Sequence, residues 1–184
     1  MSGRILIAGI GNIFLADDGF GVEVVRQLAE RGVPEGVEVV DFGIRGLDLA
    51  YALMEPYEAV VFVDALPRGE TPGTIYLIEP EVEVEGEVTL DTHGMDPVKV
   101  IRFARAMGAE IPRTLVVGCE PQNILSGENY DDMLMELSEP VLAAVDEAVK
   151  LVQSLVEETY EAKSKQEAGS STLTADGHNT EVKP

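Results

Sequence analysis

The sequence is poor in cysteine and in aromatic residues. Its 184 positions contain one cysteine, no tryptophan and 5% aromatic residues. A single cysteine excludes an intrachain disulfide and any zinc site built from several cysteines, and it fits a reducing compartment. The chain also lacks an apolar run of the ~18–20 residues that a membrane span requires, and a separate N-terminal signal with a cleavage site. We therefore expect a cytoplasmic protein without a membrane partner.

Positive charge is also scarce. Lys and Arg number 13 against 34 Asp and Glu, which gives a formal net charge of -21. Binding to nucleic acid depends on cations that neutralise phosphates, so this balance argues against a nucleic-acid partner. With 45% hydrophobic residues the chain can still bury a substantial core. A macromolecular partner is therefore expected to be a protein.

Short apolar segments alternate with segments of helical spacing. The expected strands are residues 5–8, 37–42, 59–63, 74–78 and 114–118, and the expected helices are residues 19–31, 47–55, 98–107 and 140–159. Residues 5–8 and 59–63 lack polar alternation, as expected for strands buried on both faces of a parallel sheet. The pattern predicts an α/β fold, a three-layer α/β/α sandwich with a five-stranded, mostly parallel, mixed and twisted sheet. The short link before residues 74–78 predicts that this strand is antiparallel to the third.

The chain divides into one folded unit and a tail. Residues 1–161 are expected to form a single α/β domain. From residue 162 onward hydrophobic residues become sparse, and Ser, Thr, Gly and Lys become frequent. Residues 162–184 are therefore predicted to be a disordered C-terminal tail.

Residues 5–25 read as a strand, a tight glycine loop and a helix, with two adjacent aspartates in the loop. Gly9 and Gly11 begin a dinucleotide-binding pattern, but Phe14 occupies the position of its third glycine. Asp17 and Asp18 would repel a phosphate and attract a cation. The loop therefore suits a metal or a positively charged group. One of the two aspartates is expected to cap the helix that follows, which leaves the other for chemistry.

Sites in open α/β sheets form at the carboxyl ends of the strands. The polar residues expected there are Asp17, Asp18, Asp41, Asp64, His93 and Glu120. Two carboxylates and one imidazole would make a three-ligand metal set with positions open for water or substrate. Each residue also has a structural interpretation, since an aspartate that ends a strand often serves a turn and a histidine can bond to the backbone. Their convergence at one end of the sheet favours a site.

The single thiol offers another chemistry. Cys119 with His93 would suit a thiolate nucleophile and its base. The acidic surroundings, however, would raise the pKa of the thiol. We therefore interpret Cys119 as a small buried apolar residue. His178 lies in the predicted tail and receives no role.

Three sequence blocks occur together in a recognisable order. They are Gly9-Ile-Gly-Asn12 with Asp17-Asp18-Gly19-Phe-Gly21, then Val63-Asp64-Ala65, and then His93-Gly94. In these blocks the chain resembles the maturation endopeptidases that process the large subunit of [NiFe]-hydrogenases. The resemblance extends over residues 4–156.

The resemblance implies a hydrolase that removes the C-terminal extension of a hydrogenase large-subunit precursor after nickel insertion. The nickel belongs to the substrate and marks it for cleavage, so no resident catalytic metal is expected. By position, Asp18, Asp64 and His93 correspond to the residues that contact this nickel, and Asp17 is left as the helix cap. Asp41 is the candidate general base.

The loop after the second expected strand departs from the family pattern. Many members carry Asp-Gly-Gly-Thr or a similar sequence where this chain has Asp41-Phe-Gly-Ile-Arg-Gly46. Asp41 and Gly43 are kept, whereas Arg45 is introduced. Gly43, Arg45 and Glu120 are candidate substrate-binding residues. Arg45 either binds a substrate carboxylate or pairs with Asp41 or Glu120, and we favour the pairing.

Two other functions fit the same residues. One is a zinc-dependent metallopeptidase that holds its own metal at the trio. The other is a non-catalytic nickel-binding protein that checks hydrogenase assembly without cutting the precursor. The acidic surface is compatible with a basic extension on the substrate.

Overall fold

The structure is a computed structural model that describes residues 3–80, 96–125 and 133–172. Five strands, four α-helices and one short 3-10 helix, η1, make up the described chain. In order they are β1 (Ile5–Ile10), η1 (Asp17–Gly19), α1 (Phe20–Arg31), β2 (Val37–Gly43), α2 (Gly46–Ala52), β3 (Ala59–Ala65), β4 (Ile75–Ile78), α3 (Pro97–Ala106), β5 (Arg113–Cys119) and α4 (Glu139–Thr172).

The strands form one mixed sheet in the order β2-β1-β3-β5-β4. The first four of these are parallel, and β4 pairs antiparallel with β5. The predicted five-stranded, mostly parallel sheet is therefore confirmed. The predicted direction of β4 relative to β3 is also correct, although β5 lies between these two strands.

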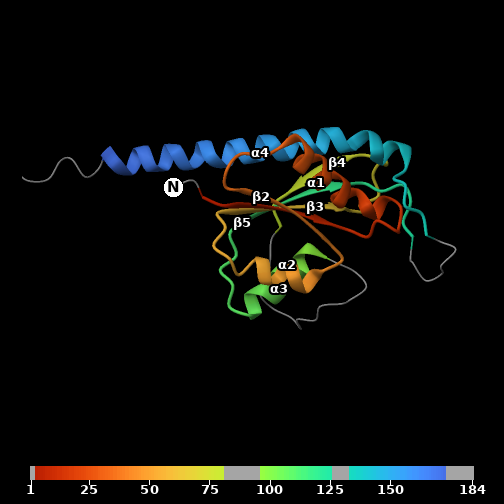
Figure 1. Ribbon diagram of the computed structural model, residues 1–184, viewed down its shortest axis with the longest axis horizontal. Helices are drawn as coiled ribbons and strands as arrows, with labels where there is room; N and C mark the ends of the chain where they lie inside the picture. The colour runs from red at the N-terminus through yellow and green to blue at the C-terminus, as the bar shows by residue number, and fades with distance from the viewer. Residues whose placement is uncertain (1–2, 81–95, 126–132, 173–184) are drawn as a thin grey trace, which may run out of the picture.

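Helices cover both faces of the sheet, which makes three layers. Helices α1 and α4 lie on one face, and α2 and α3 lie on the other (Figure 1). Successive residues of β1 point to opposite faces: Ile5 and Ile7 join the core under α1 and α4, and Leu6 and Ala8 join the core over α2 and α3. Because both faces are covered, β1 is buried at every position and β3 at every position but its last. The predicted three-layer sandwich is thus confirmed.

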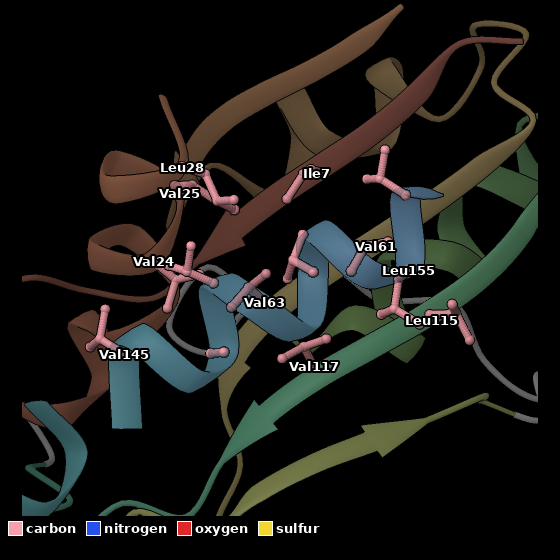
Figure 2. Close-up of a cluster of buried hydrophobic side chains, with 14 of the residues drawn as sticks. Ile7, Val24, Val25, Leu28, Val61, Val63, Leu115, Val117, Val145 and Leu155 are labelled. Carbon is pink, nitrogen blue, oxygen red and sulfur yellow. The ribbon is translucent and has the colours of Figure 1, made fainter. Parts of the chain in front are cut away.

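Helix α4 supplies much of the larger core. Leu155 lies near Val61 and Leu115 of the sheet, and Val145 lies toward Val24 of α1 (Figure 2). Burying a valine or leucine side chain fully stabilises the fold by about 1.5–3 kcal/mol, so these contacts hold α4 against the sheet. No helix in the described ranges is long and apolar enough to span a membrane.

The predicted end of the folded part differs from the structure. Helix α4 continues to Thr172, so residues 162–172, predicted as the start of the tail, are helical. Its far end extends past the sheet (Figure 1). Tyr160 and Lys163 help to anchor the helix through a hydrogen bond to the carbonyl of Glu35 and an ion pair with Glu58. The rest of the predicted tail, residues 173–184, lies outside the described residues.

Candidate active site at the carboxyl end of the sheet

The glycines after β1 allow α1 to begin very close to the ends of β1 and β3. A Cβ atom on Gly21 would lie 2.1 Å from the carbonyl oxygen of Val63 and 2.3 Å from that of Ile10. A Cβ on Gly11, where φ is 129°, would lie 1.7 Å from the carbonyl oxygen of Asp18. Only glycine fits such contacts. The glycine pattern that resembles a nucleotide loop therefore serves close packing, and it brings Asp18 to the end of β3.

Asp18 is held in this loop by one backbone donor. Its Oδ2 accepts a hydrogen bond of 2.6 Å from the amide of Asn12. The side chain is half-buried, and this burial raises the pKa of Asp18, partly offset by the hydrogen bond from Asn12. The carboxylate is thus held in position through its Oδ2 atom.

Asp64 lies beside Asp18 and is almost fully buried. It is the second-last residue of β3 and is 5% exposed. Burial raises the pKa of Asp64 well above its ordinary value, and the negative charge of Asp18 raises it further. Within residues 3–80, 96–125 and 133–172, neither carboxylate forms an ion pair with a lysine or arginine. The structure therefore places the buried Asp64 beside a second carboxylate, whose negative charge makes ionisation of Asp64 still less favourable.

The start of α3 approaches the same site. Asp96 caps this helix by accepting a 2.8 Å hydrogen bond from the amide of Val98, and Pro97 occupies the first turn. The charge of Asp96 also contributes to the raised pKa of Asp64. His93, the predicted third metal ligand, lies outside the described residues. Among those that are described, no three His, Cys, Asp or Glu side chains form a group able to hold a metal.

Asp17 has a different function from its neighbour. The prediction that it caps the following helix is wrong, because no side chain caps η1 or α1. Instead the fully buried carboxylate accepts hydrogen bonds from the amides of Gln122 (2.9 Å), Asn123 (2.7 Å) and Ser138 (2.6 Å), and from the Ser138 hydroxyl (2.9 Å). Asp17 thereby ties the site loop to the segment after β5 and to the entrance of α4. These partners lie more than 100 positions away in the sequence, so no local pattern could reveal them.

A hollow of about 440 Å³ lies between the loop after β1 and the loop after β2. Its lining residues are Gly11, Asn12, Ile13, Phe14, Val22, Asp41, Phe42, Gly43, Ile44 and Arg45. Asp41 is exposed at its edge. The hollow therefore contains Asp41, Gly43 and Arg45, three of the residues predicted to act on the substrate. It also adjoins Asp18, because Asn12 lines the hollow and its amide donates to the Asp18 carboxylate.

Arg45 is held by its own loop. Its Nε donates to the carbonyl of Phe42 at 3.1 Å, and its Nη2 donates to the carbonyl of Asp41. The guanidinium also lies 3.8 Å from the carboxylate of Asp48. The expected pairing with Asp41 thus involves the backbone of that residue rather than its carboxylate. More than half of the Arg45 side chain stays exposed, which leaves it accessible from the hollow.

Glu120 and Cys119 lie at the end of β5. The Glu120 carboxylate accepts from the hydroxyl of Tyr76 at 2.5 Å and from the amides of Arg68 at 2.8 Å and Gly69 at 3.1 Å, and these donors lower its pKa. It therefore stabilises the link between β3 and β4, and its role in substrate binding stays a prediction. Cys119 is fully buried, and burial raises the pKa of its thiol to about 12. Its interpretation as a small buried apolar residue is confirmed.

Comparison with known proteins identifies the family. Residues 22–155 match the family model described as hydrogenase maturation protease. The chain belongs to the hydrogenase maturation protease family. A candidate hydrogenase maturation protease of Methanocaldococcus jannaschii is 34% identical over 153 residues, which cover 80% of this chain and 93% of the relative.

Solved structures of the family share the fold. The hydrogenase maturating endopeptidase HybD of E. coli aligns with a TM-score of 0.66 and 26% identity over 85% of this chain and 93% of its own. The hydrogenase 2 maturation peptidase of a Thaumarchaeota archaeon aligns with a TM-score of 0.63 and 31% identity over 84% of this chain and 98% of its own. As a hydrogenase maturation protease, the chain is a peptidase, which confirms the resemblance read from its sequence and disfavours the non-catalytic alternative.

Proposed function

We propose that this peptidase removes the C-terminal extension of a [NiFe]-hydrogenase large-subunit precursor after nickel has been inserted, and that it recognises the nickel that the precursor carries. The observation that supports this proposal is the pair Asp18 and Asp64. A buried carboxylate beside a second carboxylate is unfavourable unless a cation compensates both. The described residues provide no such cation, and a metal borne by the substrate would.

In this proposal Asp18 and Asp64 bind the precursor's nickel through carboxylate oxygens, and His93 supplies an imidazole nitrogen as the third ligand. Carboxylate and imidazole donors suit divalent first-row metals such as nickel. The enzyme would hold no catalytic metal of its own. Docking on the nickel would place the scissile peptide over the neighbouring hollow, where Asp41, Gly43 and Arg45 lie.

Asp41 is the proposed general base. Its carboxylate would accept a proton from the water that attacks the scissile carbonyl carbon, so that a C–O bond forms as the C–N bond breaks. The proton would then pass to the leaving amine, and the products are a new carboxyl terminus and the released extension. Arg45 and the backbone at Gly43 would hold the extension in the hollow. The exposed position of Asp41 gives water access to this carboxylate.

The test is the intact mass of a nickel-loaded large-subunit precursor after incubation with the enzyme. Loss of a C-terminal fragment is expected with the unaltered protein and not with Asp18→Asn or His93→Ala. A nickel-free precursor should remain uncut. Cleavage of that precursor by metal-free enzyme would refute nickel recognition, and a requirement for one bound zinc per enzyme would favour the zinc metallopeptidase instead.

A further inference from the structure

A second hollow, of about 570 Å³, lies between α1 and the segment that enters α4. Its lining residues are Ile13, Gly19, Val22, Glu23, Arg26, Met135, Glu136, Leu137 and Leu142. We call it the α1–α4 groove. Its apolar side chains are unusually open to solvent, since Ile13 is 41% exposed, Met135 64% and Leu142 55%. Clustered exposed apolar side chains of this kind mark interaction sites.

The groove is continuous with the candidate active site. Ile13 and Val22 line both the α1–α4 groove and the hollow that contains Asp41. Ile13 also follows Asn12 directly, whose amide binds Asp18. A molecule that covers Ile13 therefore contacts the edge of the catalytic hollow and the groove at once.

The outer wall of the groove is bonded to the site loop. The amide of Ala16 donates to the carbonyl of Leu134 at 2.6 Å, and the amide of Leu134 donates to the carbonyl of Phe14 at 3.1 Å. Asp17 adds its two hydrogen bonds to Ser138. Asp17, the neighbour of Asp18, thus bonds the site loop to the segment that carries Met135, so the groove wall and the site loop are directly linked.

We propose that the α1–α4 groove is the docking surface for the folded body of the hydrogenase precursor, apart from the extension that is cleaved. This inference rests on the proposed function. The segment that docks presents apolar side chains to Ile13, Met135 and Leu142. Glu136 is exposed and forms no ion pair within the described parts of the chain, whereas Glu23 is already bonded to Arg26. The docking segment therefore carries a basic residue that faces Glu136.

The geometry favours the precursor over a second copy of this chain. A peptidase of this family must hold a protein substrate at its site, and the groove adjoins that site through Ile13. A second copy seated on Ile13 would cover the edge of the hollow that the substrate has to enter. An occupant that uses both surfaces at once is the molecule being processed.

The experiment compares Met135→Asp and Leu142→Asp with the matched control Met54→Asp. Met54 is 48% exposed and lines neither hollow. With nickel-loaded precursor, each groove variant is expected to raise KM about tenfold or more and to leave kcat nearly unchanged, because an aspartate in an apolar contact weakens binding without touching the reacting atoms. Met54→Asp should leave both constants unchanged.

A charge reversal provides an independent check. Glu136→Lys should raise KM by a smaller factor, and added salt should reduce the difference from the unaltered protein. Circular dichroism checks that each variant is folded. Because Glu136 is exposed, Glu136→Lys is expected to fold and to test the groove even if an aspartate at Met135 or Leu142 disturbs folding.

The outcomes are separable. Unchanged KM in all three groove variants, with normal cleavage by the unaltered enzyme, would overturn the docking surface and leave the proposed function intact. A change from dimer to monomer in the groove variants would overturn it in favour of a contact between copies. No cleavage by the unaltered enzyme would instead reject the proposed function itself.

Discussion

Carboxylates at the two ends of the sheet differ in the partners that surround them. At the amino end, Arg4 donates to Glu38 at 2.6 Å and stacks 4.6 Å from the centre of the Tyr57 ring, while the Tyr57 hydroxyl donates to Glu38 at 2.6 Å. At the carboxyl end, Asp18 and Asp64 have no cationic partner among the described residues. The polar groups of the first cluster bond to one another, whereas Asp64 lies beside the negative charge of Asp18.

This difference separates carboxylates that stabilise the fold from the pair for which we propose a function. The chain has 34 Asp and Glu residues, so the presence of acidic residues by itself identifies no site. What distinguishes Asp18 and Asp64, the pair for which we propose a function, is burial without a compensating cation among the described residues, which is unfavourable for the isolated protein and would become favourable if a cation bound. Asp17 and Glu120 are the exceptions within the carboxyl end, because hydrogen-bond donors of the fold satisfy both carboxylates.

The largest expected effect is on kcat, and it distinguishes two carboxylates of the same strand. Asp41→Asn, at the carboxyl end of β2, should lower kcat for nickel-loaded precursor about 100-fold or more, because an amide cannot accept the proton of water. Glu38→Gln, near the amino end of β2, should leave kcat unchanged. Single-turnover cleavage followed by mass spectrometry measures both, and equal rates for Asp41→Asn and the unaltered enzyme would remove Asp41 from the mechanism.

The second effect concerns stability at the carboxyl end. Asp17→Asn should lower the free energy of unfolding by about 2–3 kcal/mol, because an amide group would face buried donors that a carboxylate now satisfies. Urea unfolding monitored by circular dichroism measures the change. Asp48→Asn is the matched control, since Asp48 is exposed and makes one long ion pair. Similar stability of the two variants would contradict the anchoring role of Asp17.

The third effect has the opposite sign. Asp64→Asn should raise the free energy of unfolding by about 0.5–2 kcal/mol, because it removes a buried charge that lies beside Asp18. The same variant should fail to bind nickel-loaded precursor. Urea unfolding measures the change in stability, and a separate binding assay measures the loss of precursor binding. Destabilisation by Asp64→Asn would mean that this carboxylate stabilises the fold, as those at the amino end do.

The smallest effect belongs to the amino end and depends on pH. Hydrogen bonds from Tyr57 and Arg4 lower the pKa of Glu38 in the folded state. The resulting stabilisation is present above the ordinary pKa of glutamate and is lost as the pH falls through the lowered value. Glu38→Gln should therefore cost less than about 1 kcal/mol at pH 7, since the pair is half-exposed, and less still at pH 3. Equal costs at both pH values would show that the ion pair does not contribute.

Local patterns predicted the elements well because they depend on neighbours in the chain. Apolar runs such as residues 5–8 and 59–63 predicted buried parallel strands, and helical spacing over residues 98–107 predicted α3. The end of α4 was missed, because residues 162–172 lack the apolar spacing from which the helix was predicted. The gathering of acidic residues at one end of the sheet was also predictable, because parallel strands have their carboxyl ends at the same edge.

By itself, the sequence determined the α/β class, the gathering of Asp18, Asp41 and Asp64 at one end of the sheet, and the family. Tertiary structure alone decided the strand order, the anchoring of Asp17 to Ser138, the pairing of Arg45 with backbone carbonyls, and the α1–α4 groove. The reason is the range of the interactions involved. Periodicity and turn chemistry act over a few residues, whereas the partner of a buried carboxylate can lie more than 100 positions away.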